Sequence, residues 1–290
     1  MWVFFTCWAV TLQTVRNALQ SRLTGQVNSI GVTLSRFILA APIAGVYLTG
    51  LYTYSNQPVP SFSVSFLGIV LLAGIFQIAA TFLMVVLLRQ KNFAIGAGLA
   101  KSEAIVAGIL GTLFFGSHLN TIGWLGIVVG AIAVIIMSMG ENKRLPSVKT
   151  MLIGLACGTC FALTSLLVRE ASKLLDIPTF HAAGWVLLII LLIQSIGLSV
   201  YIALTQPNTF LQMIANKGQV LAISTVSCLG SIGWFTAMAM QHVAYVKTLG
   251  QIEVLLTLLL AHYWLKDNIN RQDVIGLLLI ALGAILVMWA

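Results

Sequence analysis

The sequence predicts an all-α integral membrane protein with ten transmembrane helices, arranged as two inverted-topology repeats of five helices each. Three observations predict this fold: a very apolar composition, ten apolar segments of spanning length, and an echo of the first half of the chain in the second. Only 8% of the 290 residues are charged, and the mean hydropathy is +1.02. Soluble domains carry about 25% charged residues. We therefore expect lipid, rather than water, to cover most of the surface.

The apolar segments have about the 20 residues that a helix needs to cross the hydrocarbon core. Helices are expected because backbone polar groups in lipid must be bonded within their own segment. Runs such as residues 186–193 do not alternate in polarity, which argues against the strands of a membrane barrel. The ten segments lie at about residues 2–21, 29–52, 63–88, 93–115, 121–139, 150–169, 179–204, 218–240, 243–264 and 272–289.

The second half of the chain repeats features of the first half at a nearly constant offset. Residues 7–11 (CWAVT) resemble residues 160–164 (CFALT), and Glu103 recurs as Glu253 in a similar apolar context. An odd number of helices per copy makes the second copy enter the membrane in the opposite sense, as in the inverted repeats of many secondary transporters. The expected units are a first repeat at 1–140, a connector at 141–149 and a second repeat at 150–290.

The basic residues are spread over short connectors, so the net charge of +8 does not indicate a nucleic-acid partner. By the positive-inside rule, the odd-numbered connectors are expected in the cytoplasm of a bacterial-type inner (plasma) membrane, with both termini outside. The odd-numbered connectors hold Arg22, Arg89, Lys91, Lys143, Arg144, Lys149, Lys217, Lys266 and Arg271, and the even-numbered ones hold Arg169 and Lys173.

Two carboxylates and several cations fall inside predicted spans, where a charge costs at least about 2.5–3.5 kcal/mol. Glu103 and Glu253 each lie about ten positions into a segment, roughly 15 Å deep at 1.5 Å per residue. Carboxylates at that depth must be paired, protonated or facing a wet cavity. Cross-helix pairs of Lys101 with Glu253, or of Lys247 with Glu103, could offer both signs of charge to a zwitterionic solute. A carboxylate could also exchange a proton.

Other polar or aromatic residues at depth are further candidates for contact with a solute. Each has a structural alternative: a long basic side chain can reach the interface, an amide can bond a neighbouring helix, and an aromatic ring can fill the core of the bundle. Arg169 ends its helix and is expected to be structural. The further candidates are Arg16, Arg36, Gln77, Trp234 and Gln251.

The small residues favour close packing, and no residue pattern indicates a metal or a cofactor. Cys157 and Cys160 have the spacing of a redox or zinc motif, but they lie in an apolar run without further ligands and are interpreted as packing residues. Stripes of small residues in the fifth and tenth segments suit close helix packing or a homodimer contact. These stripes contain Gly126, Gly130, Gly276 and Gly283.

Local motifs and the overall organisation together resemble the EamA-type transporters of the drug/metabolite transporter superfamily. The motifs are QTVRNA at 13–18, SRF at 35–37, AKSE at 100–103 and KTLGQIE at 247–253. The resemblance implies a central cavity among helices 1–4 and 6–9, with helices 5 and 10 peripheral. It also implies a role for basic residues on the fourth and ninth helices, and termini in the cytoplasm, opposite to the charge count. Both orientations stay open.

These observations predict a secondary active transporter that exports a small polar metabolite, amino-acid-like or otherwise zwitterionic or anionic, by alternating access around a midplane cavity. The alternative is a transport-inactive membrane sensor or assembly subunit on the same scaffold. An intramembrane hydrolase is disfavoured, because Ser231 lies between glycines in a pattern that is not a nucleophile elbow. The expected ligands are a small molecule and the lipid bilayer, with proton coupling as an option.

Overall fold

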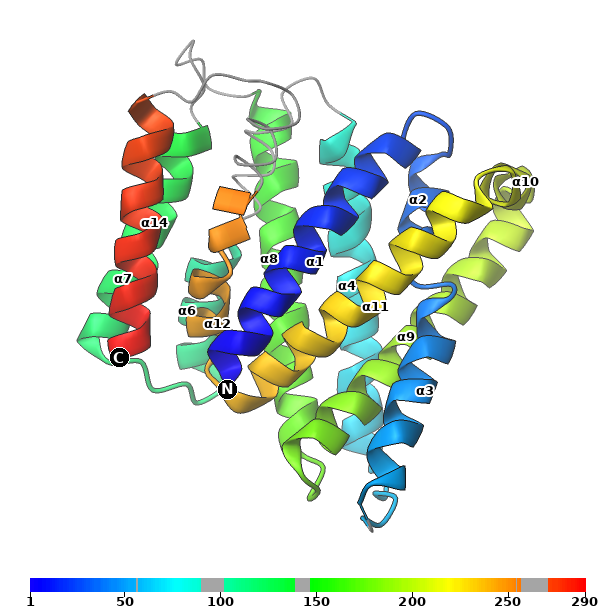
Figure 1. The fold of residues 1–290 in the computed structure, drawn as a ribbon, viewed down its shortest axis with the longest axis horizontal. Coiled ribbons are helices and arrows are strands. Elements are labelled where there is room, and N and C mark those ends of the chain that lie inside the picture. Colours follow the sequence, from blue (N-terminus) through cyan, green and yellow to red (C-terminus); the bar gives the residue numbers. More distant parts are fainter. Residues whose placement is uncertain (56, 90–101, 139–146, 254, 257–270) are drawn as a thin grey trace.

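The computed structural model describes the chain except for residues 56, 90–101, 139–146, 254 and 257–270. Most of the described residues are helical, with no strand among them, which confirms the all-α prediction for that part (Figure 1). The helices are α1 (Trp2–Leu23), α2 (Ser29–Ser35), α3 (Ala40–Thr53), α4 (Val64–Leu88), α6 (Glu103–Phe114), α7 (Thr121–Ser138), α8 (Val148–Lys173), α9 (Thr179–Thr205), α10 (Asn208–Ala215), α11 (Lys217–Met240), α12 (Val243–Leu249) and α14 (Arg271–Trp289).

Five segments of the described chain are long and apolar enough to cross a membrane, and shorter apolar helices accompany them. The two termini lie at the same end of the bundle, and α10 lies across the opposite end (Figure 1). The five segments that are long and apolar enough to span are Ser29–Thr53, Val64–Leu88, Val148–Lys173, Thr179–Thr205 and Lys217–Met240.

Polar caps begin several helices: the Ser63 hydroxyl accepts a hydrogen bond from the Phe66 amide before α4, and Ser147 does the same for Thr150 before α8.

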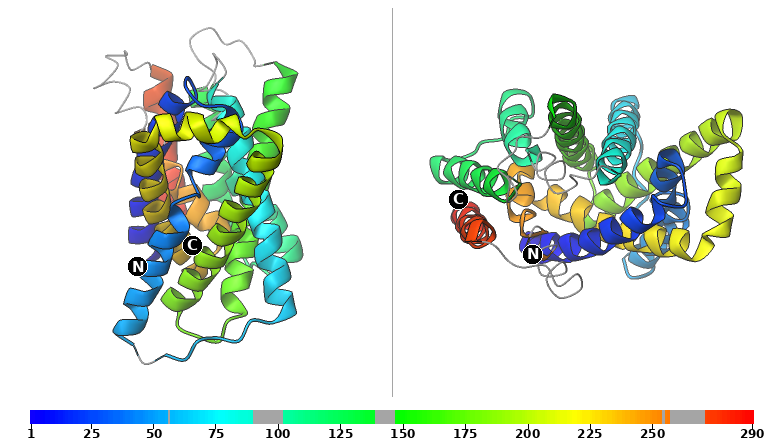
Figure 2. Two further views of the ribbon diagram at one scale, coloured as in Figure 1. Left: turned by 90° about the vertical axis from the view of Figure 1, so that its right-hand side faces the viewer. Right: turned by 90° about the horizontal axis from the view of Figure 1, so that it is seen from above.

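The helices pack in long pairs that join the two halves of the chain. α1 packs along α11, α4 along α8, and α3 along α9. α7 and α14 form a further pair at one edge of the bundle, opposite to the edge that α10 occupies (Figure 2). α6 contacts both α8 and α12, in the region between the α7–α14 pair and the rest of the bundle.

The small-residue stripes of α7 and α14 face each other within the chain. A Cβ added at Gly283 would lie 2.9 Å from the Gly126 carbonyl oxygen and 3.1 Å from the Gly130 amide nitrogen. Gly276 is buried as well. The stripes therefore serve the close helix packing that the sequence suggests, and a homodimer through them stays a prediction.

The predicted helix at 29–52 is two helices, because the backbone turns at residues 36–39 between α2 and α3. Side chains from other helices bond the backbone groups at this break. Ser224 of α11 donates to the Ser35 carbonyl at 2.6 Å and accepts from the Leu39 amide at 3.3 Å. Ser195 of α9 donates to the Phe37 carbonyl at 2.7 Å. Such bonds allow a helix to be interrupted inside the bundle.

Two further elements differ from the sequence-based expectation. α12 ends at Leu249, with Gly250 as its C-cap, and helical residues resume at Ile252, so the predicted helix at 243–264 is interrupted near its start. A Cβ at Gly250 would lie 2.6 Å from Cη2 of Trp234, so this close approach requires glycine. The connector after α9 contains the short helix α10, which its Pro-containing sequence did not indicate.

Candidate functional site: a charged cavity within the bundle

A cavity lies among α1, α4, α6, α8, α11 and α12, beside the turn that follows α2. Its volume of about 40 Å³ exceeds the roughly 10–15 Å³ that one water molecule needs. Both signs of charge occur in its wall. The lining residues are Gln13, Arg16, Arg36, Gln77, Met84, Glu103, Phe161, Thr164, Ser165, Ser231, Trp234, Phe235, Met238 and Lys247.

Glu103 and Lys247 form a buried ion pair in this wall. Lys247 Nζ lies 3.4 Å from Glu103 Oε2, and the two side chains are 8% and 10% exposed. This contact confirms the cross-helix pair that the sequence favours for these two residues. Glu103 is the first residue of α6, where the helix dipole stabilises a negative charge. Lys247 Nζ also lies 4.3 Å from the ring centroid of Trp234, a cation–π contact.

A chain of hydrogen bonds leads from the cavity wall to Glu253. Trp234 Nε1 donates to Gln13 Oε1 at 3.0 Å, and Gln13 Nε2 donates to Glu253 Oε2 at 2.6 Å. Asn17 Nδ2 donates to the other oxygen, Glu253 Oε1, at 2.7 Å. Glu253 is 5% exposed and is not among the lining residues. The Glu253 carboxylate is therefore hydrogen-bonded to Gln13 of the cavity wall and is not itself part of that wall.

Arg16 is held beside these carboxylates. Its NH2 and Nε groups donate to Asn17 Oδ1 at 2.9 and 3.3 Å. Glu253 and Glu103 both interact electrostatically with its guanidinium. The charge of Arg16 is thus compensated inside the bundle, although the side chain is 5% exposed.

Arg36 lies in the turn between α2 and α3 and has a different environment. Its NH1 donates to Thr81 Oγ1 at 2.7 Å, and its Cζ lies 5.3 Å from the centroid of the Phe37 ring. The side chain is 4% exposed, and its buried Nε has no hydrogen-bond partner in the described part of the chain. No carboxylate of the described residues forms an ion pair with it.

The two candidate glutamines have different surroundings. Gln77 lines the cavity and accepts a hydrogen bond at 2.7 Å from Gln194, which ties α4 to α9. Gln251 is 1% exposed and lies outside the lining, against Gly130 of α7. Both amide atoms of Gln251 lack a partner among the described residues.

The structure brings most of the predicted site together around one cavity. Glu253 reaches it through Gln13, Gln251 lies apart, and Lys101 falls outside the described residues. Sequence reasoning missed Asn17 and Thr81, which position Arg16 and Arg36. Asn17 could have been found, since it lies four residues after Gln13 on the same helix face, whereas Thr81 resembles any packing threonine. The predicted residues in the lining are Arg16, Arg36, Gln77, Glu103, Trp234 and Lys247.

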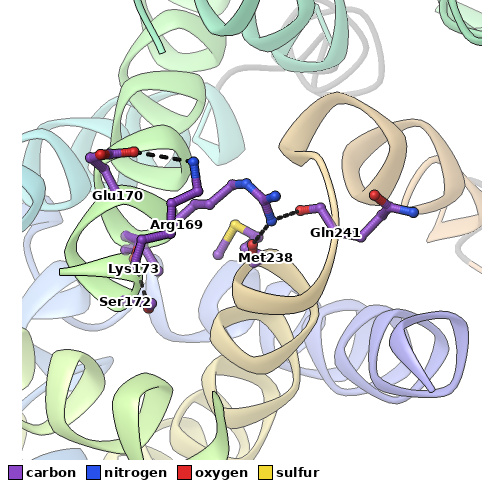
Figure 3. A network of polar contacts seen from close by, with 7 residues as sticks. Arg169, Glu170, Ser172, Lys173, Met238 and Gln241 are labelled. Atoms are coloured by element: carbon purple, nitrogen blue, oxygen red, sulfur yellow. Dashed lines mark hydrogen bonds and ion pairs between the residues drawn. The ribbon is translucent and has the colours of Figure 1, made fainter. Parts of the chain in front are cut away.

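Another arginine binds a helix end outside this cavity (Figure 3). Arg169, near the end of α8, donates through NH1 to the carbonyls of Met238 and Gln241 at the end of α11. Neighbouring Lys173 and Glu170 pair at 3.4 Å on the same helix. Carbonyls at a helix end lack intrahelical partners, so Arg169 fills the structural role that its position predicts.

Comparison with known proteins agrees with this class of fold. Residues 148–289 match the sequence profile of the EamA-like transporter family. A solved structure, described as "Crystal structure of protein", matches 99% of this chain and 96% of its own length, with a TM-score of 0.72 and 17% sequence identity. At that identity the likeness concerns the fold. No curated protein matches significantly.

These findings define a multi-pass membrane protein of a transporter class. The match over residues 148–289 shows an EamA-like unit and so places the chain in the drug/metabolite transporter superfamily, as the sequence motifs suggest. The EamA family is a family of transporters, not of enzymes.

Proposed function

We propose that this protein is a secondary active transporter that moves a small polar solute through the charged cavity by alternating access. One observation carries the proposal: the buried Glu103–Lys247 pair lies in a cavity wall together with Arg16 and Arg36, inside a bundle of apolar helices. Ionisable residues at such depth are costly and typically mark a solute or ion pathway. The wall offers both signs of charge, which suits an amino-acid-like or other zwitterionic or anionic solute.

The architecture that we propose for this movement is ten spans in two inverted repeats, at 1–140 and 150–290. Helix packing supports it. If α1 corresponds to α8, and α4 to α11, then exchanging the halves turns the α1–α11 pair into the α8–α4 pair. The pairs α3–α9, α6–α12 and α7–α14 each join corresponding helices. Two such halves can rock about a shared site.

The same proposal includes the direction of transport, the orientation of the chain in the membrane and the coupling of transport to protons. Export is the direction that the family resemblance implies, and the connector charges favour odd-numbered connectors in the cytoplasm of an inner membrane. Glu103 is the proposed proton-coupling group, because it is buried, lines the cavity and forms an ion pair with Lys247. A proton on Glu103 would release Lys247 and thereby change the charge that a solute meets.

The test is solute flux into proteoliposomes that contain the purified chain, with a panel of amino acids, organic acids and neutral metabolites. We expect flux of at least one solute, and a dependence on a pH gradient that Glu103→Gln abolishes. Glu170→Gln is the matched control, since Glu170 lies outside the cavity and pairs with Lys173 near the end of α8. Folded protein without flux of any solute would contradict transport and favour a sensor or assembly subunit.

A further inference from the structure

We infer that the cavity contains a subsite for the carboxylate of a small organic anion, and that Arg36 is the residue that binds it. The inference deepens the proposed function by assigning a substrate class, and it rests on that function in that the bound anion is the solute carried. Binding at Arg36 can nevertheless be measured without any flux.

Among the described residues that line the cavity, Arg36 is the cation that no carboxylate compensates. Lys247 is paired with Glu103, and Arg16 interacts with both Glu253 and Glu103. Arg36 interacts unfavourably with Arg16, and among the described residues no carboxylate forms an ion pair with it. A buried cation without a counter-charge is costly, so an anion entering the cavity is stabilised at Arg36.

The guanidinium of Arg36 has hydrogen-bond donors to spare. A guanidinium carries five N–H donors in a planar fork, and the described residues accept one hydrogen bond from it, at Thr81 Oγ1. Nε is fully buried and lacks a partner in the described part of the chain. Unmade hydrogen bonds of a buried charged group are costly. A carboxylate accepts two parallel N–H bonds from an arginine and would satisfy this group.

The backbone break presents Arg36 to the cavity. Arg36 is the first residue of the turn between α2 and α3, and Ser224 and Ser195 from two other helices bond the backbone of that turn. Thr81 of α4 holds one end of the guanidinium. The side chain is therefore positioned by three surrounding helices before a ligand enters, which lowers the ordering cost of binding.

The rest of the wall indicates the body of the ligand. Apolar and aromatic side chains make up much of the lining, so a carboxylate bound at Arg36 would carry a small apolar group. These side chains are Met84, Phe161, Trp234, Phe235 and Met238.

Matched pairs of probes test the inference: isovalerate with isovaleramide, L-leucine with L-leucinamide, and L-phenylalanine with L-phenylalaninamide. Each is titrated against the purified full chain in detergent without added phospholipid, and the dissociation constant comes from the rise in the midpoint of thermal unfolding. We expect at least one carboxylate to bind and its carboxamide to bind at least about tenfold more weakly. Inorganic phosphate, which lacks an apolar body, should bind more weakly than that carboxylate.

Variants locate the subsite. Arg36→Gln should weaken the carboxylate at least about tenfold, and Arg36→Lys should weaken it less. Arg22→Gln is the matched control, because Arg22 is exposed near the end of α1, outside the lining; it should change affinity less than about twofold. If Arg36→Gln does not fold, Thr81→Val replaces it and should weaken binding about threefold or more.

Several results would overturn the inference: carboxamides that bind as tightly as carboxylates, phosphate that binds more tightly than every carboxylate, unchanged affinity in Arg36→Gln or Thr81→Val, or no carboxylate that binds. Flux separates this inference from the proposed function. Flux of neutral or cationic solutes alone would overturn the anion subsite and leave transport standing. Carboxylate binding that depends on Arg36, in a chain without flux, would support the subsite and contradict transport.

Discussion

Arg16 and Arg169 each lie nine residues after the start of the two similar stretches, 7–11 and 160–164, yet they have different surroundings. Arg16 lines the cavity, where Asn17 and two carboxylates hold it. Arg169 lies outside the cavity lining, where its hydrogen bonds go to the carbonyls of Met238 and Gln241 at the end of α11. Equivalent positions in two similar stretches of sequence therefore do not define the role of an arginine. The role of each arginine follows from the groups that accept its hydrogen bonds.

Arg36 makes fewer hydrogen bonds to the described residues than either of these arginines. Arg169 is bound by helix-end carbonyls, which cannot leave, so it stabilises a fixed arrangement of α8 and α11. In the described part of the chain, Arg36 has one hydrogen-bond partner, the neutral Thr81, and its remaining donors can bind a ligand. The protein thus satisfies the guanidinium of Arg169 better than that of Arg36. A bound ligand is therefore expected to interact most strongly with Arg36.

The largest expected effect comes from the ion pair of the cavity. Lys247→Met or Glu103→Gln alone removes one charge of the buried ion pair, and breaking such a pair costs about 3–5 kcal/mol. The double variant should recover much of this free energy of unfolding but none of the flux. Unfolding in mixed micelles and a double-mutant cycle measure the effect. Additive single effects would show that the 3.4 Å contact contributes no coupling.

Arg169→Gln should act on stability rather than on binding. Losing charge-assisted hydrogen bonds to Met238 and Gln241 should lower the free energy of unfolding by about 1.5–3 kcal/mol. Carboxylate affinity of the folded fraction should stay within about twofold. Arg36→Gln should give the reverse pattern, and similar effects of both variants on affinity would remove the distinction between the two regions.

The contact between α7 and α14 can be changed without altering a residue of the cavity lining. Gly283→Ala places a Cβ 2.9 Å from the Gly126 carbonyl oxygen, so the helices must separate, at a cost of about 1–3 kcal/mol in unfolding experiments. Gly45→Ala is the control, since its Cβ would meet no described atom within 4 Å and alanine favours a helix. Equal stabilities of the two variants would contradict this packing. Light scattering on the same samples reports whether a homodimer forms through these faces.

The smallest effect concerns pH near Arg169. Burial lowers the pKa of His242, and the positive charges of Arg169, Lys173 and His118 lower it further. The unfolded state then binds a proton more readily than the folded state. Stability from this histidine is full above about pH 6.5 and is lost as pH falls through the lowered pKa. His242→Gln should flatten the slope of unfolding free energy against pH below about 6.5, and an unchanged slope would contradict the assignment.

Local sequence predicts most helices well, because apolar length and caps are local properties. The segment predicted at 63–88 is α4 at Val64–Leu88, and the one at 121–139 is α7 at Thr121–Ser138. The break after Ser35 was missed, although Pro42 in the first turn of α3 disfavours a continuous helix, because its missing N–H leaves the Ile38 carbonyl without a helical hydrogen bond. The tertiary contribution was not predictable: serines of α9 and α11 bond the freed backbone groups.

The depth of Glu103, together with the echo between the two halves, also predicts part of the site, since Glu103 and Lys247 form an expected cross-helix pair. The depth of a residue in its segment does not show which way its side chain points, however. Gln251 and Glu253 lie two residues apart at similar depth, yet Glu253 joins the cavity network through Gln13 while Gln251 faces α7. Residues two apart on a helix point about 200° away from each other, so one of the two joins the network, and depth does not say which.

The most direct test of the central claim is flux in proteoliposomes that contain equal amounts of folded wild-type, Arg16→Gln and Arg169→Gln protein. The solute is the one with the highest wild-type flux. If the cavity is the pathway and the helix-end cluster a structural support, Arg16→Gln should lower flux at least about tenfold and Arg169→Gln less than about twofold. Equal losses in both variants, or full flux in Arg16→Gln, would contradict the assignment of the cavity as the transport site.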